Sequence, residues 1–355
     1  MQLVPSGILV QPKAITTFPD GQITHEPIEE GEVILQTEVG SLKAREHYDM
    51  HQSVEHGNRV THLVNRTVID GEVRVPVGVS LFHIHETVRT VLDDICAVLS
   101  LCYRTPVNYY EIRYRPEDGV DGVVHESFLR RRLKRVIREE GADELINFRD
   151  LRNGGLNDLY QAFKTSAHRD TIARVLGFLA SSHDSEAIEE SYFLAFAALE
   201  ATISAAADVQ SAYTLTSSPF RRLCKRLRKT ISEFLAEISA TSRIELINDK
   251  LPELQRVSTK HRIDQVVQTF QVATADLWVK KGFAVGMARA TTNRNILVHE
   301  AVVAPTEQLL RDRVRLWVLV ERVILRLLAW PDEKIWRWYS QPLRWVNRVE
   351  EHAEN

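Results

Sequence analysis

Arg294, Asn295 and His299 bring three side chains suited to RNA cleavage within six residues of an otherwise apolar segment. A histidine titrates near neutral pH, so it can take a proton from a ribose 2′-hydroxyl or give one to the leaving 5′-oxygen. An arginine can hold a phosphate through two parallel hydrogen bonds and offset the charge that builds up in the transition state. Residues 293–300 are therefore a candidate site for phosphoryl chemistry.

The positions of these side chains on a helix limit how they could act together. Asn295 and His299 are four residues apart and share a face, whereas Arg294 and His299 are about 140° apart on an ideal helix. Three arrangements remain open: the arginine reaches round the helix, the motif straddles a helix end, or a second copy of the chain completes the site. The non-catalytic alternative is a polar patch with a satisfied histidine.

A carboxylate interrupts the apolar and small residues of 192–203. Glu200 follows Phe196 by four residues on the helix expected there, either at the edge of the buried stripe or in a cleft. A partly buried carboxylate usually needs a cationic partner, and Arg294 or His299 would serve. An exposed glutamate on a helix flank is the alternative.

Two runs of basic residues could follow a phosphate backbone, because clustered arginine and lysine side chains on a helix neutralise successive phosphates. The alternative is a solvated helix face with acidic neighbours such as Glu139 and Glu140. The runs consist of Arg130, Arg131, Arg132, Lys134, Arg135 and Arg138, and of Arg221, Arg222, Lys225, Arg226, Arg228 and Lys229. The candidate RNA contacts taken from them are Arg130, Arg131, Arg221, Arg222 and Lys225.

Histidines in the first quarter of the chain offer a different chemistry. His47 and His51 are four residues apart and would share a helix face. His83 and His85 are two residues apart and would share a strand face. Either spacing suits a metal ion, but neither pair has a recognised third-ligand spacing, and residues 82–87 are also typical of a helix start. A metal-dependent hydrolase is therefore an alternative. The cluster also contains His56 and His62.

The elements that must position these residues fall into two parts. Up to about residue 125, short β-branched or aromatic runs predict strands, and Asp70-Gly71 predicts a hairpin turn. After residue 126 helical periodicity dominates, and Ser185 can cap a helix that runs to residue 206. The predicted strands are 32–37, 67–69, 73–75 and 109–114, and the other predicted helices are 81–103, 218–239, 262–280, 284–302, 306–330 and 333–352. We therefore predict an α+β fold, with a strand-rich sensor or regulatory domain over 1–175 and an all-helical domain over 185–355.

Composition is that of a globular protein and disfavours disordered and coiled-coil classes. Of 355 residues, 44% are hydrophobic and 26% are charged. The net charge of −3 is uneven: the first 100 residues carry 7 Lys+Arg against 14 Asp+Glu, net −7, and the remainder carries 38 against 34, net +4. This pattern excludes a broad electrostatic grip on nucleic acid and permits a local one.

The sequence also indicates the compartment. Cys96, Cys102 and Cys224 form no CxxC pair, which predicts reduced core residues and not a disulfide framework or zinc ribbon. The longest apolar stretch, 316–330, contains three charged residues and predicts a buried amphipathic helix, with no membrane partner. The first ten residues lack the basic flank and cleavage site of a secretory signal. We expect a cytoplasmic protein.

The helical half resembles the HEPN superfamily, and most closely the C-terminal HEPN domain of ApeA-type abortive-infection proteins. An F-x-x-L-E-A-x-I-like helix is followed about 95 residues later by R-N-x-x-x-H in a helical bundle. The resemblance covers roughly residues 185 to 330. The matching residues are Phe196, Leu199, Glu200, Ala201 and Ile203, then Arg294, Asn295 and His299.

The resemblance implies a metal-independent endoribonuclease without a cofactor, active as a homodimer whose two motifs meet in one cleft and leave a 2′,3′-cyclic phosphate and a 5′-hydroxyl. His299 would be the general acid and base, Arg294 the phosphate-holding group, Asn295 an orienting group, and Glu200 a supporting partner. Such an antiviral-defence or toxin effector would have three partners: RNA, a second copy of the chain, and a protein or phage-derived trigger at the N-terminal domain. The alternative from another class is a catalytically inactive HEPN-like module for dimerisation or nucleotide binding.

Overall fold

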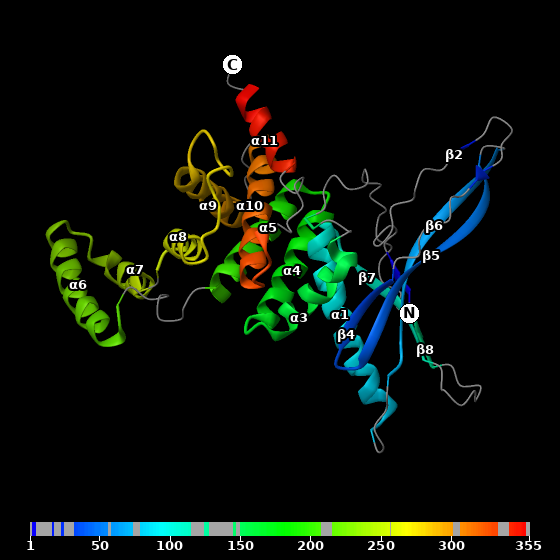
Figure 1. Ribbon diagram of the computed structural model, residues 1–355. Helices are drawn as coiled ribbons and strands as arrows, with labels where there is room; N and C mark the ends of the chain where they lie inside the picture. Colours follow the sequence, from blue (N-terminus) through cyan, green and yellow to red (C-terminus); the bar gives the residue numbers. More distant parts are fainter. Residues whose placement is uncertain are drawn as a thin grey trace.

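The computed structural model describes residues 2–4, 16–17, 23–24, 32–55, 58–73, 79–114, 124–127, 145–146, 150–206, 215–255, 257–300, 306–332 and 341–352. Strands are confined to the N-terminal part, where one long helix accompanies them, and the rest is helical (Figure 1), which confirms the predicted α+β class. No helix within these ranges is both long enough and apolar enough to cross a membrane.

The main sheet has six antiparallel strands in the order β4-β5-β6-β1-β7-β8. β4 (Glu32–Thr37) and β7 (Asn108–Tyr114) confirm two predicted strands. β5 (Gly40–Glu55) and β6 (Asn58–Gly71) form a long ribbon that extends well beyond the short strand predicted there (Figure 1). The other strands are β1 (Gln2–Val4) and β8 (Val124–Ser127) in this sheet, and β2 (Thr16–Thr17) and β3 (Ile23–Thr24) in a separate ribbon.

The predicted hairpin at Asp70-Gly71 is wrong, because both residues continue β6 in register with β5. The chain turns instead between β4 and β5. There Gly40 adopts φ +126°, a conformation that favours glycine, and Thr37 Oγ1 donates a hydrogen bond to the Gly40 oxygen at 2.7 Å. The strand predicted at 73–75 is wrong at Val73, which lies outside any strand. The other two residues of that segment are not among those described.

α1 (Leu81–Tyr103) has the predicted bounds. Ser80 caps its start, since its Oγ accepts a hydrogen bond from the His83 backbone nitrogen at 3.3 Å. The predicted apolar face is buried and consists of Val88, Leu92, Ile95, Cys96 and Leu99. Cys96, Cys102 and Cys224 are buried and form no disulfide, as predicted.

The helices of the proposed site follow the predicted pattern. α5 (Ile188–Ala206), α9 (Phe283–Glu300) and α10 (Thr306–Leu327) confirm three predicted helices. Ser185 does not cap α5: it is the C-terminal cap of the preceding helix, and its hydroxyl donates to the Ala187 oxygen at 3.1 Å.

Two other predicted helices differ in extent. The helix predicted at 262–280 is wrong beyond residue 269, because α8 (Thr259–Thr269) ends there and the chain turns at Gln271, with φ +50°. Of the helix predicted at 333–352, residues 333–340 lie outside the described ranges and the rest forms α11 (Gln341–His352).

The strand-rich and helical parts share one hydrophobic core. A π-helical turn η1 (Leu151–Gly155) leads into α3 (Leu156–Thr165) and α4 (Arg169–Asp184), and α4 contacts both α1 and α5. The predicted boundary between residues 175 and 185 therefore falls within or just after a helix that joins the two parts. The division into two domains stays a prediction.

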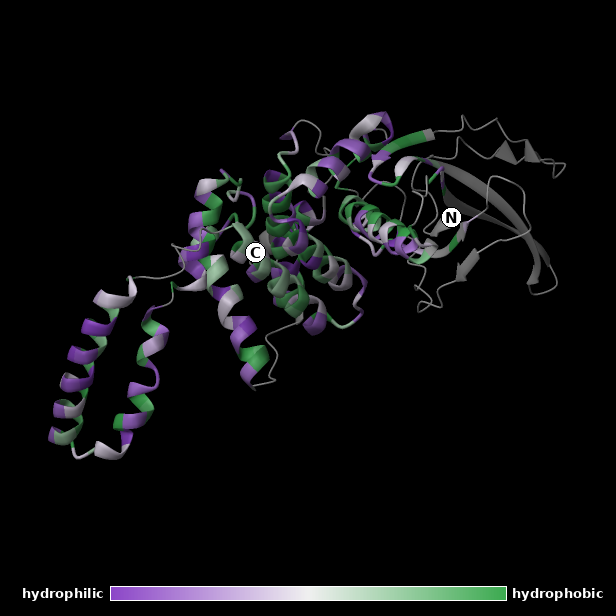
Figure 2. Cartoon of the chain, turned by 90° about the horizontal axis from the view of Figure 1, so that it is seen from below, coloured by the Kyte–Doolittle hydropathy of each residue, from purple (hydrophilic) through white to green (hydrophobic). Residues whose placement is uncertain are grey.

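A helical hairpin projects from the bundle (Figure 1, Figure 2). α6 (Ser217–Glu237) forms one limb and confirms most of the helix predicted at 218–239. The chain returns through η3 (Thr241–Arg243), α7 (Ile244–Asn248) and η4 (Leu251–Gln255). Phe220, Cys224 and Leu251 give the hairpin a small core of its own. We call residues 215–255 the α6 arm.

Candidate functional site

α5 and α9 contact each other, which brings Glu200 and Arg294 together. The Tyr192 hydroxyl donates to the Ala290 oxygen at 2.7 Å, and further along both helices Arg294 Nη2 donates to Glu200 Oε2 at 3.1 Å. Burial raises the pKa of the Tyr192 hydroxyl, so this group stays protonated and keeps its role as a donor. The register of α9 on α5 is thereby fixed at both positions.

Asp312 on α10 anchors α9 from another side. Its buried carboxylate accepts hydrogen bonds from Trp278 Nε1 at 2.9 Å and from Arg289 Nη2 at 2.8 Å. Gly286 allows the Trp278 ring to lie against the α9 backbone, because a Cβ at this position would be 2.2 Å from Trp278 Cγ. A buried carboxylate that accepts several hydrogen bonds is difficult to displace. Asp312 therefore holds α9, the helix that carries Arg294, in a fixed position.

The Arg294 guanidinium has three neighbours. It donates from Nη2 to Glu200 Oε2 and, at 3.2 Å, from Nη1 to Asn295 Oδ1, and its Cζ lies 5.8 Å from the centroid of the Phe196 ring. Of the two partners considered for Glu200 from the sequence, the structure therefore has Arg294. The side chains of Arg294 and Glu200 are 26% and 37% exposed. Because both side chains reach solvent, the ion pair is weak. The guanidinium can therefore give up a hydrogen bond to Glu200 and donate to an anion that arrives from solvent.

His299 is not part of this cluster. It is exposed in the last turn of α9, and within the described part of the chain nothing hydrogen-bonds to its ring. The whole motif lies inside α9, so it does not straddle a helix end, and the Arg294 guanidinium is turned toward α5. Of the three arrangements considered from the sequence, the completion of the site by a second copy of the chain stays a prediction.

The face of α9 that carries Asn295 and His299 is open along the helix. Five residues on this face are all exposed, have small or uncharged side chains, and follow one another at intervals of three or four residues: Val285, Ala288, Thr292, Asn295 and His299. Val298 beside them is 44% exposed. Short side chains of this kind permit close approach of another helix.

The candidate RNA contacts are not at this site. Arg130 and Arg131, with the rest of the first basic run, lie outside the described residues. Arg221, Arg222 and Lys225 are exposed on α6, which Figure 1 shows apart from α5 and α9. The structure therefore separates the second basic run from the Glu200–Arg294 pair.

Both secondary-structure assumptions behind the histidine sites are wrong. His47 and His51 lie on β5 and not on a helix. His83 and His85 lie on α1, where residues two positions apart are rotated by about 200° around the helix axis and so lie on nearly opposite sides. His85 Nδ1 lies 3.0 Å from the Tyr114 hydroxyl. Among the described residues, no three His, Cys, Asp or Glu side chains are grouped to hold a metal ion. His56 and the side chains of His47, His51 and His62 lie outside the part of the chain that the structure describes.

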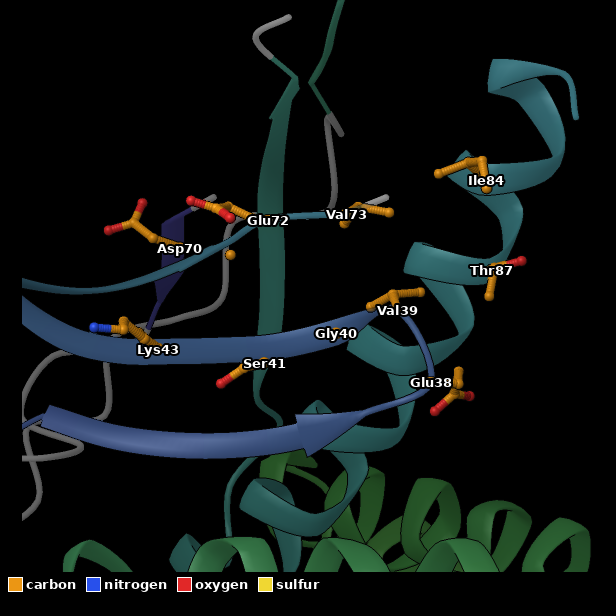
Figure 3. A pocket seen from close by; sticks show the side chains of 11 residues that line it. Glu38, Val39, Gly40, Ser41, Lys43, Asp70, Glu72, Val73, Ile84 and Thr87 are labelled. Atoms are coloured by element: carbon orange, nitrogen blue, oxygen red, sulfur yellow. The ribbon is translucent and has the colours of Figure 1, made fainter. Parts of the chain in front are cut away.

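A cavity of about 910 Å³ lies in the N-terminal part, between the β4–β5 turn, the end of β6 and the first turns of α1 (Figure 3). Its lining includes apolar Val39 and Ile84 and charged Glu38. Glu38 also accepts a hydrogen bond from the Tyr160 hydroxyl at 3.0 Å and pairs with Lys164, both on α3. This cavity could not be predicted from the sequence, because the β5–β6 register and α1 together assemble it.

The residues that hold α9 in place were not identified from the sequence as part of the site. Asp312 carries the clearest signal, since a carboxylate three residues after Leu309 and four before Leu316 falls on the buried stripe of its own helix. Its partners Trp278 and Arg289 are distant in the sequence and have no local pattern that links them to it.

Comparison of the chain with protein-family models, with curated proteins and with solved structures finds no match in any of the three. The function is therefore inferred from Arg294, Asn295, His299 and Glu200 themselves.

Proposed function

We propose that the chain is a metal-independent endoribonuclease of HEPN type. The observation that carries this proposal is the Glu200–Arg294 pair, at 3.1 Å, beside an open helix face with Asn295 and His299. A partly exposed guanidinium held by a carboxylate offers a planar set of donors to a phosphate that arrives from solvent. The resemblance of the α5 and α9 motifs to the HEPN superfamily supports the same chemistry.

The reaction is an internal transfer at one RNA phosphate. The neutral imidazole of His299 takes the proton of the ribose 2′-hydroxyl while the 2′-oxygen attacks phosphorus. The P–O2′ bond forms and the P–O5′ bond breaks, and the protonated imidazole of a second His299 gives its proton to the 5′-oxygen. Arg294 holds the non-bridging oxygens, Asn295 orients the reacting group, and Glu200 positions Arg294. The products are a 2′,3′-cyclic phosphate and a 5′-hydroxyl.

A second copy of the chain supplies the second histidine. In one chain Arg294 faces α5 and His299 faces solvent, so a twofold pairing of the open α9 faces is the arrangement that joins both residues to one phosphate. The small and uncharged members of that face suit such a contact.

The N-terminal part is proposed to receive a protein or phage-derived trigger, as in a cytoplasmic antiviral-defence or toxin effector. Its first 100 residues have net charge −7, which disfavours RNA there. RNA is therefore expected on the helical half.

Incubation of the purified protein with labelled RNA in EDTA tests the proposal. We expect cleavage by the wild type and a loss of at least about 100-fold in His299→Ala and in Arg294→Ala. His261→Ala on α8 and Arg344→Ala on α11 are matched controls at exposed positions and should cut RNA at the wild-type rate. Light scattering reports whether each variant remains a dimer.

Two other outcomes contradict the proposal. Cleavage that disappears in EDTA but persists in His299→Ala would assign the reaction to a metal site elsewhere in the chain. An intact dimer that cuts no RNA in any form would favour the inactive HEPN-like module for dimerisation or nucleotide binding.

A further inference from the structure

The α6 arm presents a dense basic surface that the cleavage site does not use. Six exposed cations occupy nine consecutive positions of α6 near the base of the arm, and the arm stands away from the bundle (Figure 2). We call them the α6 basic surface: Arg221, Arg222, Lys225, Arg226, Arg228 and Lys229.

These cations share one side of the helix. On an ideal helix they fall within an arc of about 160° and span about 12 Å along the axis. The other side is apolar, and its residues Phe220 and Cys224 are buried. Burial of one side therefore directs all six charges outward as a continuous surface.

Little within the arm neutralises this surface. In the described part of the chain the single carboxylate paired with it is Glu233, whose Oε1 lies 3.8 Å from Lys229 Nζ. The solvated-face alternative requires acidic neighbours, and most carboxylates of the arm lie on the return limb instead. There Glu253 pairs with Lys250 at 2.8 Å. The α6 basic surface thus keeps a strong local positive charge in a chain whose net charge is −3.

We propose that the α6 basic surface binds the sugar–phosphate backbone of RNA and docks a long substrate away from the point of cleavage. The docking role rests on the proposed nuclease function. Four of the six cations are arginines, which bind phosphate oxygens through two parallel hydrogen bonds. Contacts of this kind position RNA without reading its sequence, so the surface favours long RNA of any sequence.

The arm is not built to lie on a membrane. A helix at a lipid interface inserts a free apolar face, whereas the apolar side of α6 along its basic surface is largely covered by the arm's own core, and Leu223 at its edge is 38% exposed. Phe234 and Ile238 are exposed, but they lie beyond the basic surface at the far end of α6. The surface itself therefore offers mainly charge and little apolar area.

Binding is measured on full-length His299→Ala protein, so that bound RNA stays intact. The arm variant adds Arg222→Glu, Lys225→Glu and Arg226→Glu, and the matched control adds Arg243→Glu, Arg344→Glu and Arg348→Glu, which change the net charge equally at other exposed positions. We expect the arm variant to weaken RNA binding at least about tenfold and to make the negative slope of log K against log salt shallower by about 2. The control should weaken binding less than about threefold, and circular dichroism should show both variants folded.

Equal weakening by the two variants, or unchanged binding by the arm variant, would overturn the proposal. So would binding of wild type to vesicles of phosphatidylserine and phosphatidylcholine that the arm variant loses while it keeps its RNA affinity.

A cleavage assay separates this inference from the nuclease proposal. If the arm substitutions abolish RNA binding but protein with His299 intact cuts no RNA, the nuclease proposal fails and RNA binding by the arm stands. If that protein cuts RNA and the arm substitutions leave long and short RNA cut at wild-type rates, the docking proposal fails and the nuclease stands.

Discussion

The Glu321 carboxylate on α10 accepts two hydrogen bonds from Arg104, 217 residues earlier in the chain, at 2.7 Å from Nε and 2.6 Å from Nη2. Arg104 ends α1 in the left-handed conformation, with φ +50°. The two side chains are 4% and 0% exposed. A buried ion pair therefore joins the long N-terminal helix to the helix that packs on α5.

Replacing Glu321 with Gln should destabilise the protein by about 3–5 kcal/mol, because the Arg104 charge would remain buried without its counter-charge. Urea unfolding measures this loss. Glu307→Gln is the control, since its pair with Arg311 lies at the surface and contributes little. A loss of the same size in both variants would show that the buried pair has no special role.

The stability of the wild type should fall more steeply in acid than that of Glu321→Gln. Burial alone would raise the pKa of Glu321, but the charge and hydrogen bond of Arg104, together with those of His183, outweigh burial and hold this pKa below its ordinary value of 4.5. A carboxyl whose pKa is lower in the folded state stabilises the protein above its unfolded pKa, and this contribution is lost as the pH falls. Urea midpoints below about pH 5 measure the difference. Parallel pH profiles for the two proteins would contradict the assignment.

Gly286→Ala should destabilise the protein by about 1–3 kcal/mol and reduce RNA cleavage, because the new methyl group would push α9 away from Trp278. Gly177→Ala is the matched control on α4, where a Cβ would meet no atom within 4 Å. It should raise stability by about 0.4–1 kcal/mol. Thermal unfolding distinguishes the two, and equal effects would rule out the close approach of Trp278 to α9.

Glu200→Gln should lower the rate of RNA cleavage about tenfold, since Arg294 loses the carboxylate that positions it. Stability should change by less than about 1 kcal/mol, because the pair is partly exposed. Glu200→Asp should restore part of kcat, which a purely structural role would not predict. Glu237→Gln, at an exposed position on α6, is the control. A wild-type kcat in Glu200→Gln would remove Glu200 from the mechanism.

Local patterns in the sequence predicted the elements whose own residues determine them. α1 has its predicted bounds because Ser80 caps it and one face is apolar throughout. The Asp70-Gly71 turn failed because pairing with the long β5 strand outweighs the preference of a dipeptide. The helix predicted through residue 280 ends at residue 269, because the chain turns at Gln271 with φ +50°, and Trp278 beyond this turn is buried and donates to Asp312.

The candidate site was predictable only in part for a related reason. Glu200 needed a cationic partner, and the choice could be narrowed to Arg294 or His299 from the sequence. The network of Trp278, Arg289 and Asp312 could not be predicted, since it joins residues from separate segments that meet only in the folded protein. The placement of the α6 basic surface away from the site also depends on tertiary structure.

The chemistry of the RNA ends produced in EDTA tests the proposed function most directly. Attack by the 2′-oxygen leaves a 2′,3′-cyclic phosphate on one fragment and a 5′-hydroxyl on the other. We expect mass spectrometry to find both ends with the wild type and neither with His299→Ala. A 3′-hydroxyl with a 5′-phosphate, or the cyclic phosphate produced equally by His299→Ala, would contradict the assignment of His299.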